Sequence, residues 1–540
     1  MLVFFSVGLV YSYFNPRFFP VVAAALLVLP FRAVLSLAVD FGEGDYDSFS
    51  PVISGIRNPR FLLVFLGFLA FPLIAVLLNF APSWSVFGEI PYLLGAISVI
   101  VLIWSEAFYQ KNFYFDRWHI IERFGLVAIG LIALIVSPLF LFLFMLIHRI
   151  ITEQFDYPGL GGFNYTHSQL PFTLIYILGA FSVVSIFVNI NPRMVSFLLL
   201  CGLASHYFHP GIAKIKNGVS YYIFENNPVS LFLNAYQIGW MSWLDENIVH
   251  KIGRISQKTR PLSNVFVVLT ETGVLLILLW RPLSIVLLSS ILVLHTMIFL
   301  STGDNFWKWM SIVLAAIFGL IFIPGQSVDL FTDNSWFLMS IPFIVFAKAW
   351  MNPVSMNWLD SFYVEFFEFK ADLTDGREIK LNPNIFRPYD SIISQGITGT
   401  LDFLGENPRL TFSYGGITES QNKRFHQILF HLIEKENMDE DESKKLVNDC
   451  GIQSYDEIKV KRLENLLEQF LDNRSSKSSM IQYFSSPREF YSAGIFERED
   501  RELLGLIENI RVVRIDGIWT EEEFQVLNET EVLEVSVNEG

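Results

Sequence analysis

Residues 203–218 read LASHYFHPGIAKIKNG and close an apolar segment of the chain. The stretch gathers two histidines and two lysines around Pro210-Gly211, where we expect the helix to break because proline has no amide hydrogen to donate. Ionisable side chains are costly to place at the mouth of a membrane helix. We therefore expect the flanking segments to form a scaffold that holds this stretch in place.

Composition and charge divide the chain into two parts. Of its 540 residues 52% are hydrophobic, and the mean hydropathy is +0.43, which is unlike a soluble domain. Residues 1–350 carry a net charge of +1 and residues 351–540 a net charge of −16. The sequence predicts a helical transmembrane domain over 1–351 and an acidic soluble domain over 352–540. Because acidic surfaces repel the phosphate backbone, nucleic acid is excluded as a partner.

Apolar segments recur throughout the first part. Most reach the length that a helix needs to cross a bilayer, so we predict about ten spans, at 18–39, 61–80, 92–108, 124–148, 171–191, 194–208, 263–280, 282–301, 308–324 and 336–351. Three of them begin with Asn-Pro-Arg, at residues 15, 58 and 191. Asparagine caps free amides and proline suits the first helical turn, so this tripeptide predicts helix starts.

The distribution of basic residues suggests an orientation. Lysine and arginine collect in 109–123 and 249–262, whereas 81–91 and 325–335 contain none. By the positive-inside rule the basic loops and the acidic domain face the cytoplasm. This orientation requires residues 219–245 to re-enter the membrane, and we expect a protein of a bacterial-type inner membrane.

Glu271 and His295 lie deepest among the ionisable residues of the predicted spans, and such residues are either functional or paired as structural polar groups. The spans at 263–280 and 282–301 are joined by a tight turn. The two residues are therefore expected at similar depths, roughly 15 and 20 Å from one membrane face. We predict that they face each other beneath 203–218.

His206 and His209 are three residues apart and share a helical face. Such a pair can bind a metal, but no third ligand is marked by spacing, so we predict no metal site; the alternative is a pair of hydrogen-bonding groups. Lys214 and Lys216 are either headgroup anchors or, if one is desolvated, a source of a neutral amine that acts as a general base.

Residues 208–218, FHPGIAKIKNG, resemble the aromatic-x-x-Gly-x-x-Lys-Leu stretch of the horizontally transferred transmembrane (HTTM) superfamily. That superfamily includes the vitamin K-dependent γ-glutamyl carboxylases. The resemblance implies that Lys214 matches the lysine implicated as the base that deprotonates vitamin K hydroquinone. Ala213 stands at the family's first lysine, and Asn217-Gly218 replaces the start of its usual Asp-x-Trp.

Further parts of the family pattern follow in order: Glu271, the turn at 280–283 (WRPL), His295 and the stretch 303–306 (GDNF). The resemblance covers residues 203–310. It implies a membrane fold, and an apolar quinol or lipid-like ligand that enters from the bilayer. In the carboxylases the C-terminal domain is lumenal, in contrast to the cytoplasmic placement inferred above.

The acidic domain has the pattern of an α+β fold. Alternation and turn residues predict strands at 362–373, 378–381, 510–515 and 531–537, and helical periodicity predicts helices at 420–436 and 455–472. No phosphate-binding loop, dinucleotide motif or nucleophile elbow is present in the sequence. We therefore expect the acidic domain to have a binding or regulatory role.

The leading hypothesis is a membrane enzyme, carboxylase-like or a quinol-dependent lyase or oxidoreductase. Lys214 is its base, with His206, His209, Glu271 and His295 as proton-relay or orienting groups. One alternative is a transporter or channel component in which Glu271 and His295 carry protons or ions. Another is a membrane scaffold that recruits a protein partner through its acidic domain.

Overall fold

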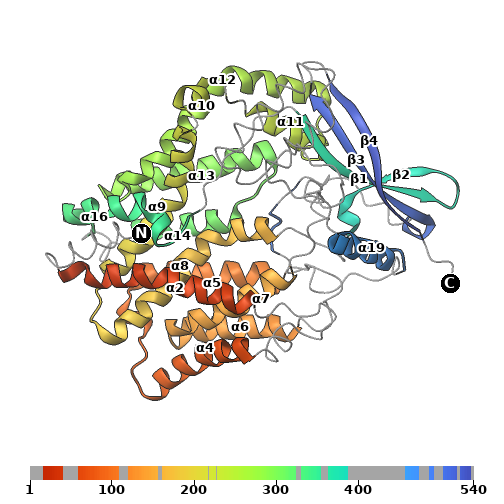
Figure 1. Ribbon diagram of the computed structural model, residues 1–540. Coiled ribbons are helices and arrows are strands. Elements are labelled where there is room, and N and C mark those ends of the chain that lie inside the picture. The colour runs from red at the N-terminus through yellow and green to blue at the C-terminus, as the bar shows by residue number, and fades with distance from the viewer. Residues whose placement is uncertain are drawn as a thin grey trace, which may run out of the picture.

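The computed structural model describes residues 16–40, 59–108, 120–155, 161–216, 218–224, 226, 228–323, 330–353, 363–386, 457–472, 486–489, 491, 503–519 and 523–536. The first part of the chain forms a bundle of helices, and the last part forms a small antiparallel sheet with one helix against it (Figure 1). The last apolar helix ends at Val345 and the first strand begins at Tyr363, on either side of the change in charge.

Helices make up nearly all of the described bundle. They are α2 Phe19–Asp40, α4 Pro59–Leu77, α5 Glu89–Ala107, α6 Ile120–Ile135, α7 Leu141–Phe155, α8 Gly161–Phe187, α9 Pro192–Lys216, α10 Val219–Phe224, α11 Val229–Gln237, α12 Glu246–Gly273, α13 Arg281–Thr302, α14 Trp307–Phe322 and α16 Asn334–Val345. Pro59 and Pro192 open α4 and α9, as the Asn-Pro-Arg tripeptides predict. The Asn191 side chain accepts a hydrogen bond from the amide of Arg193 at 3.0 Å, as a helix cap does.

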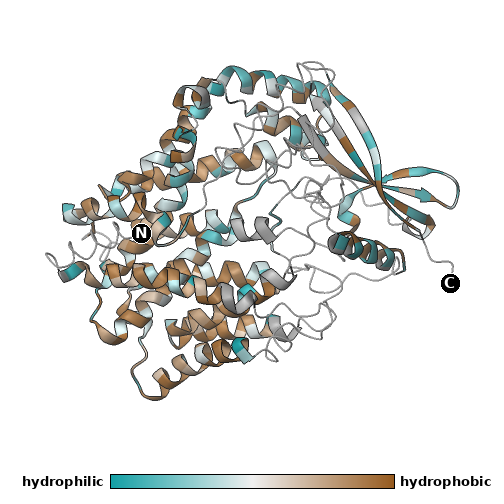
Figure 2. Cartoon of the chain, viewed as in Figure 1, coloured by the Kyte–Doolittle hydropathy of each residue, from teal (hydrophilic) through white to brown (hydrophobic). Residues whose placement is uncertain are grey.

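Five helical segments are long and apolar enough to cross a membrane, among the residues that the structure describes. They lie at Pro59–Leu77, Glu89–Ala107, His167–Phe187, Pro192–Lys216 and Arg281–Thr302. Four further predicted spans, 18–39, 124–148, 308–324 and 336–351, correspond to shorter apolar helical segments of 10–17 residues, at Phe19–Leu35, Arg123–Ile135, Pro138–Ile151, Trp307–Phe322 and Asn334–Val345. The predicted span at 263–280 falls on the second half of α12 and belongs to neither group of described segments. Apolar residues cover most of the bundle in Figure 2.

The spanning-length helices differ in how deeply they are buried. Only 17% of the apolar window of α4 and 28% of that of α13 lie inside the protein, so both present apolar faces that a bilayer can cover. In contrast, 94% of the window of α9 is buried. Helices α2, α5, α8, α12 and α16 pack against α9, whose buried part extends to Lys214, so most of the helix lies inside a shell of other helices.

The predicted single span at 124–148 is wrong. The chain forms α6 and α7, which pack against each other, with a short 3-10 turn at Pro138–Phe140 between them. Ser137 adopts an extended conformation and its hydroxyl accepts from the amide of Leu139 at 3.3 Å. This Ser-Pro cap starts a new helical segment, and apolar composition alone does not reveal it.

The predicted helix break at Pro210-Gly211 is also wrong, because α9 continues through both residues to Lys216. Gly211 has a packing role instead. A Cβ atom at this position would lie 2.9 Å from the Cβ of Glu271 and 3.1 Å from the backbone nitrogen of Thr272. The glycine therefore lets α9 approach α12 closely, at the level of Glu271.

The sheet contains β1 Tyr363–Leu373, β2 Glu378–Leu381, β3 Ile507–Trp519 and β4 Phe524–Ser536, in the order β2-β1-β3-β4. All three pairings are antiparallel. Over the described residues the predicted strands coincide with parts of these elements, and the predicted helix at 455–472 is α19, Glu457–Asp472. The predicted helix at 420–436 lies outside the described residues.

The two faces of the sheet contact different elements. Phe367, Phe369 and Val512 pack with α19 on one face. On the other face, apolar residues of the sheet pack against α11 and the start of α12; this set is Val229, Phe232, Leu233, Val249, Phe366, Val513, Ile515 and Trp519. Contact with the sheet thus accounts for the apolar residues of α11, which the re-entrant interpretation of 219–245 assigned to the membrane.

Candidate functional site

Lys214 and Glu271 form a buried ion pair between α9 and α12. The Lys214 ammonium lies 2.8 and 2.7 Å from the two carboxylate oxygens of Glu271. The side chains are 3% and 10% exposed. Burial of two charges is unfavourable unless they are paired with good geometry, and this two-oxygen contact supplies that geometry. The close approach of the helices at Gly211 brings the Glu271 backbone within reach of α9.

His295 reaches the same helix at a different level. Its Nε2 lies 3.0 Å from the Tyr207 hydroxyl, and both side chains are buried. Tyr207 and Lys214 are seven residues apart, which corresponds to two turns and roughly 10 Å along α9. Glu271 and His295, which were predicted to face each other, thus each contact the same face of α9 at different levels. Both residues do lie beneath 203–218, as predicted.

The histidines of α9 point to different neighbours. His206 Nε2 lies 2.9 Å from the Thr173 hydroxyl of α8, whereas His209 Nε2 donates to the Ile344 carbonyl of α16 at 3.2 Å. Because their partners are on separate helices, the two imidazoles do not form a shared ligand pair. Within the described ranges, no group of three or more His, Cys, Asp or Glu side chains has the geometry to hold a metal ion.

Aromatic rings surround the Tyr207–His295 contact. The Trp309 ring packs edge-to-face on His206, Tyr207 and His295, with centroid distances of 5.3, 5.5 and 6.0 Å. The Phe306 ring lies 4.8 Å from the His295 ring. The Nδ1 atoms of His206 and His295 are buried and have no hydrogen-bond partner among the residues that the structure describes. The site thus combines hydrogen-bonding capacity with an apolar wall.

A second polar group lies where α8 meets the turn between α13 and α14. His167 Nε2 is 3.3 Å from a carboxylate oxygen of Asp304, and the His167 ring stacks on Phe306 at 4.5 Å. Burial, followed by the nearby charge of Glu489, raises the pKa of Asp304 well above its ordinary value. The Asp304 carboxyl is consequently a group that favours its neutral, protonated form.

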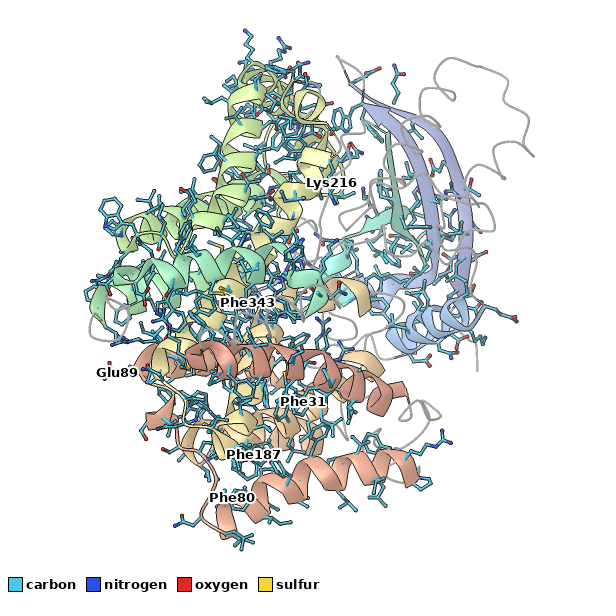
Figure 3. The ribbon with its side chains drawn as sticks, turned by 60° about the vertical axis from the view of Figure 1, so that its left-hand side comes forward. Phe31, Phe80, Glu89, Phe187, Lys216 and Phe343 are labelled. Carbon is cyan, nitrogen blue, oxygen red and sulfur yellow. The ribbon has the colours of Figure 1, made fainter. Side chains whose placement is uncertain are left out.

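Lys308 completes this second group. Its ammonium is buried, donates to the Ser168 hydroxyl at 2.9 Å and pairs with Glu489 of the acidic domain at 2.6 Å. Figure 3 shows the course of α9 beside these elements: Phe187 ends α8 below, and Lys216 ends α9 above.

Sequence reasoning selected five residues, and all five are buried: His206, His209, Lys214, Glu271 and His295. It missed Tyr207, Asp304 and Lys308. Tyr207 lies within residues 203–218 and Asp304 within the GDNF stretch at 303–306, but the sequence pattern assigned a role to neither residue. Lys308 had no signal, because a lysine at a span end normally extends to the headgroups.

The arrangement can hold and exchange protons in an apolar surrounding. Carboxyl, amine, imidazole and phenol groups are all present within the buried α9 interface, and their contacts are within hydrogen-bond distance. No protein-family model, curated protein or solved structure matches the chain.

Proposed function

We propose that the chain is an integral membrane enzyme in which the Lys214–Glu271 pair accepts a proton from an apolar, weakly acidic substrate. The observation that carries the proposal is the burial of this pair between α9 and α12 with both carboxylate oxygens on one ammonium. A quinol is the substrate class that the resemblance to the HTTM superfamily implies.

The proton balance of the pair explains why it suits this reaction. The pair starts as an ammonium at Lys214 that donates to both oxygens of a carboxylate at Glu271. When a substrate hydroxyl transfers its proton to the Glu271 carboxylate, the products are a carboxylic acid at Glu271 beside the Lys214 ammonium and a substrate anion. The ammonium then stabilises the anion, and a low dielectric strengthens that attraction.

The apolar faces of the bundle support entry from the bilayer. Helices α4 and α13 leave most of their apolar surface uncovered, and α13 also carries His295. A hydrophobic substrate that partitions into the membrane can reach helices of the site without crossing water. The histidines and Tyr207 are positioned to orient such a ring, since aromatic side chains surround them.

The basic residues of α12, and not the re-entrant segment on which the sequence-based orientation depended, support a cytoplasmic location for the acidic domain. The first half of α12 carries Lys251, Arg254, Lys258 and Arg260, and Val249 of the same half packs on the sheet. Basic residues beside membrane helices are concentrated on the cytoplasmic side. In this proposal the helices cross an inner membrane of bacterial type, and the acidic domain lies on its cytoplasmic side.

The proposed function is tested with the full-length chain in nanodiscs and a short-chain menaquinol as the probe. Binding is measured for the wild type, K214M, E271Q and the control K216M. Lys216 is an exposed lysine two residues from Lys214, so K216M removes a charge without touching the buried pair. Menaquinol binding should be lost in K214M and E271Q and retained in K216M. Equal behaviour of all four proteins overturns the assignment.

Proton translocation is a second candidate function, and the separation of polar groups along the bundle favours it. Lys214–Glu271, Tyr207–His295 and His167–Asp304 form successive buried contacts. Proton flux into proteoliposomes that stops in E271Q and in H295F, without any added quinol, would favour this function over the enzyme. Absence of flux in the wild type rules against it.

A further inference from the structure

A short strap of the acidic domain, residues 486–489 and 491, binds the turn that joins α13 to α14. The amide of Asn305 donates to the carbonyl of Glu489 at 2.7 Å, and the amide of Tyr491 donates to the carbonyl of Gly303 at 3.1 Å. The strap lies more than 180 positions after this turn in the sequence, so the contact joins the two parts of the chain. Backbone bonds in both directions fix its register on the turn.

Side chains strengthen the contact. Glu489 Oε1 lies 2.6 Å from the ammonium of Lys308, which is 1% exposed. The Tyr491 ring packs against Phe299 and Trp240, with centroid distances of 5.6 and 6.3 Å. A buried ammonium requires a compensating charge. Among the described residues, Glu489 is the carboxylate paired with Lys308, so the acidic domain supplies the charge that the bundle needs.

The turn under the strap also forms one wall of the buried site. Phe306 packs on His295, which contacts Tyr207, and on His167. Gly303 adopts a positive φ of 73°, and a Cβ atom there would lie 2.9 Å from the Trp240 ring. The turn is therefore tightly fitted between the strap and the rings that line the site.

We propose that the strap is a cap of the buried site and that Glu489 is the positioning residue that holds it closed. A ligand or protein that binds the acidic domain and withdraws the strap would loosen the turn. Loosening of the turn would then change the contacts of His295 with Phe306 and Tyr207. The inference rests on the proposed function only because it takes the buried polar side chains around α9 as the functional site. It assigns the acidic domain a regulatory role through one buried ion pair.

Hydrogen exchange of the full-length chain in nanodiscs tests the cap directly. The Asn305 amide reports on the strap, because its hydrogen bond is to the Glu489 carbonyl. E489Q should speed exchange at residues 303–306 by about a hundredfold, since removing one partner of a buried pair is strongly unfavourable. E489D should restore part of the protection. The matched control is E529Q, which removes a carboxylate that pairs with Lys370 on the sheet.

The outcomes separate the cap from the proposed chemistry. Unchanged exchange at 303–306 in E489Q, or an equal change in E529Q, overturns the cap. Persistent protection of α9 amides in the same sample verifies that the bundle remains folded. If exchange rises but menaquinol binding to E489Q equals that of the wild type, the coupling to the site is overturned. If the wild type binds no menaquinol, the proposed function fails, and the exchange result still decides whether Glu489 holds the strap.

Discussion

Replacing Lys214 by methionine should leave Glu271 as an uncompensated buried carboxylate. The pair is joined at 2.7 and 2.8 Å, and the two side chains are 3% and 10% exposed, so solvent screens it little. At an effective dielectric constant of about 20, opposite charges at this separation attract by about 6 kcal/mol, most of which offsets desolvation. Breaking one side of such a pair costs about 3–5 kcal/mol.

The double variant K214M/E271L should behave differently. Replacing both charges by apolar side chains removes the desolvation cost as well as the attraction, so its stability should lie within about 1 kcal/mol of the wild type or above it. The free energy of unfolding is measured by denaturant titration of the detergent-solubilised chain, followed by tryptophan fluorescence. K216M is the control and should change stability by less than about 0.5 kcal/mol.

Two results would refute this reasoning. One is a cost below about 1 kcal/mol for both K214M and E271L, which would mean that water reaches the pair. The other is a double variant whose loss equals the sum of the single losses, which would mean that the two residues act independently. A stable double variant that has lost menaquinol binding would instead show that the pair is kept for function.

Three further predictions concern the packing around the site. G211A should destabilise the protein by about 1–3 kcal/mol in the same unfolding titration, because the added methyl group meets α12 at 2.9 Å. The control G67A should be neutral or stabilising, because a Cβ atom there meets no described atom within 4 Å. Y207F should cost about 1–3 kcal/mol and shift the imidazole NMR signals of His295, which loses its buried partner at 3.0 Å; unshifted signals would contradict the contact. The raised pKa of Asp304 means that the folded state holds the proton more tightly than the unfolded state, so wild-type stability should fall as pH rises above the unfolded pKa of 3.8 until the folded pKa is passed. D304N should lack this decline in unfolding titrations at a series of pH values, and an identical pH profile would refute the assignment.

Much of the fold could be predicted from local sequence. Asn-Pro-Arg marked the starts of α4 and α9, and alternation with turn residues marked β1 and β2. These signals succeed because capping and strand alternation are determined by a few neighbouring residues. The extension of α9 through Pro210 was not predictable in this way. Packing by the surrounding helices stabilises it, and that packing is tertiary.

The sequence could predict which residues belong to the candidate site, but not which of them contact each other. The cost of burying ionisable groups identified Glu271 and His295, but it did not indicate their partners. Depth along two antiparallel helices placed them near each other, whereas the rotation of each helix directs Glu271 to Lys214 and His295 to Tyr207. Glu489 pairs with Lys308 from a distant part of the sequence, so no local sequence pattern could predict this ion pair.

Infrared difference spectroscopy of the full-length chain in nanodiscs tests the central claim most directly. Addition of menaquinol should yield a band of a protonated carboxyl group, because the proton of the quinol leaves Glu271 as a carboxylic acid beside the Lys214 ammonium. The band should be absent in E271Q and present in the K216M control. A wild-type spectrum without a protonated carboxyl band, or one that E271Q leaves unchanged, would contradict the account.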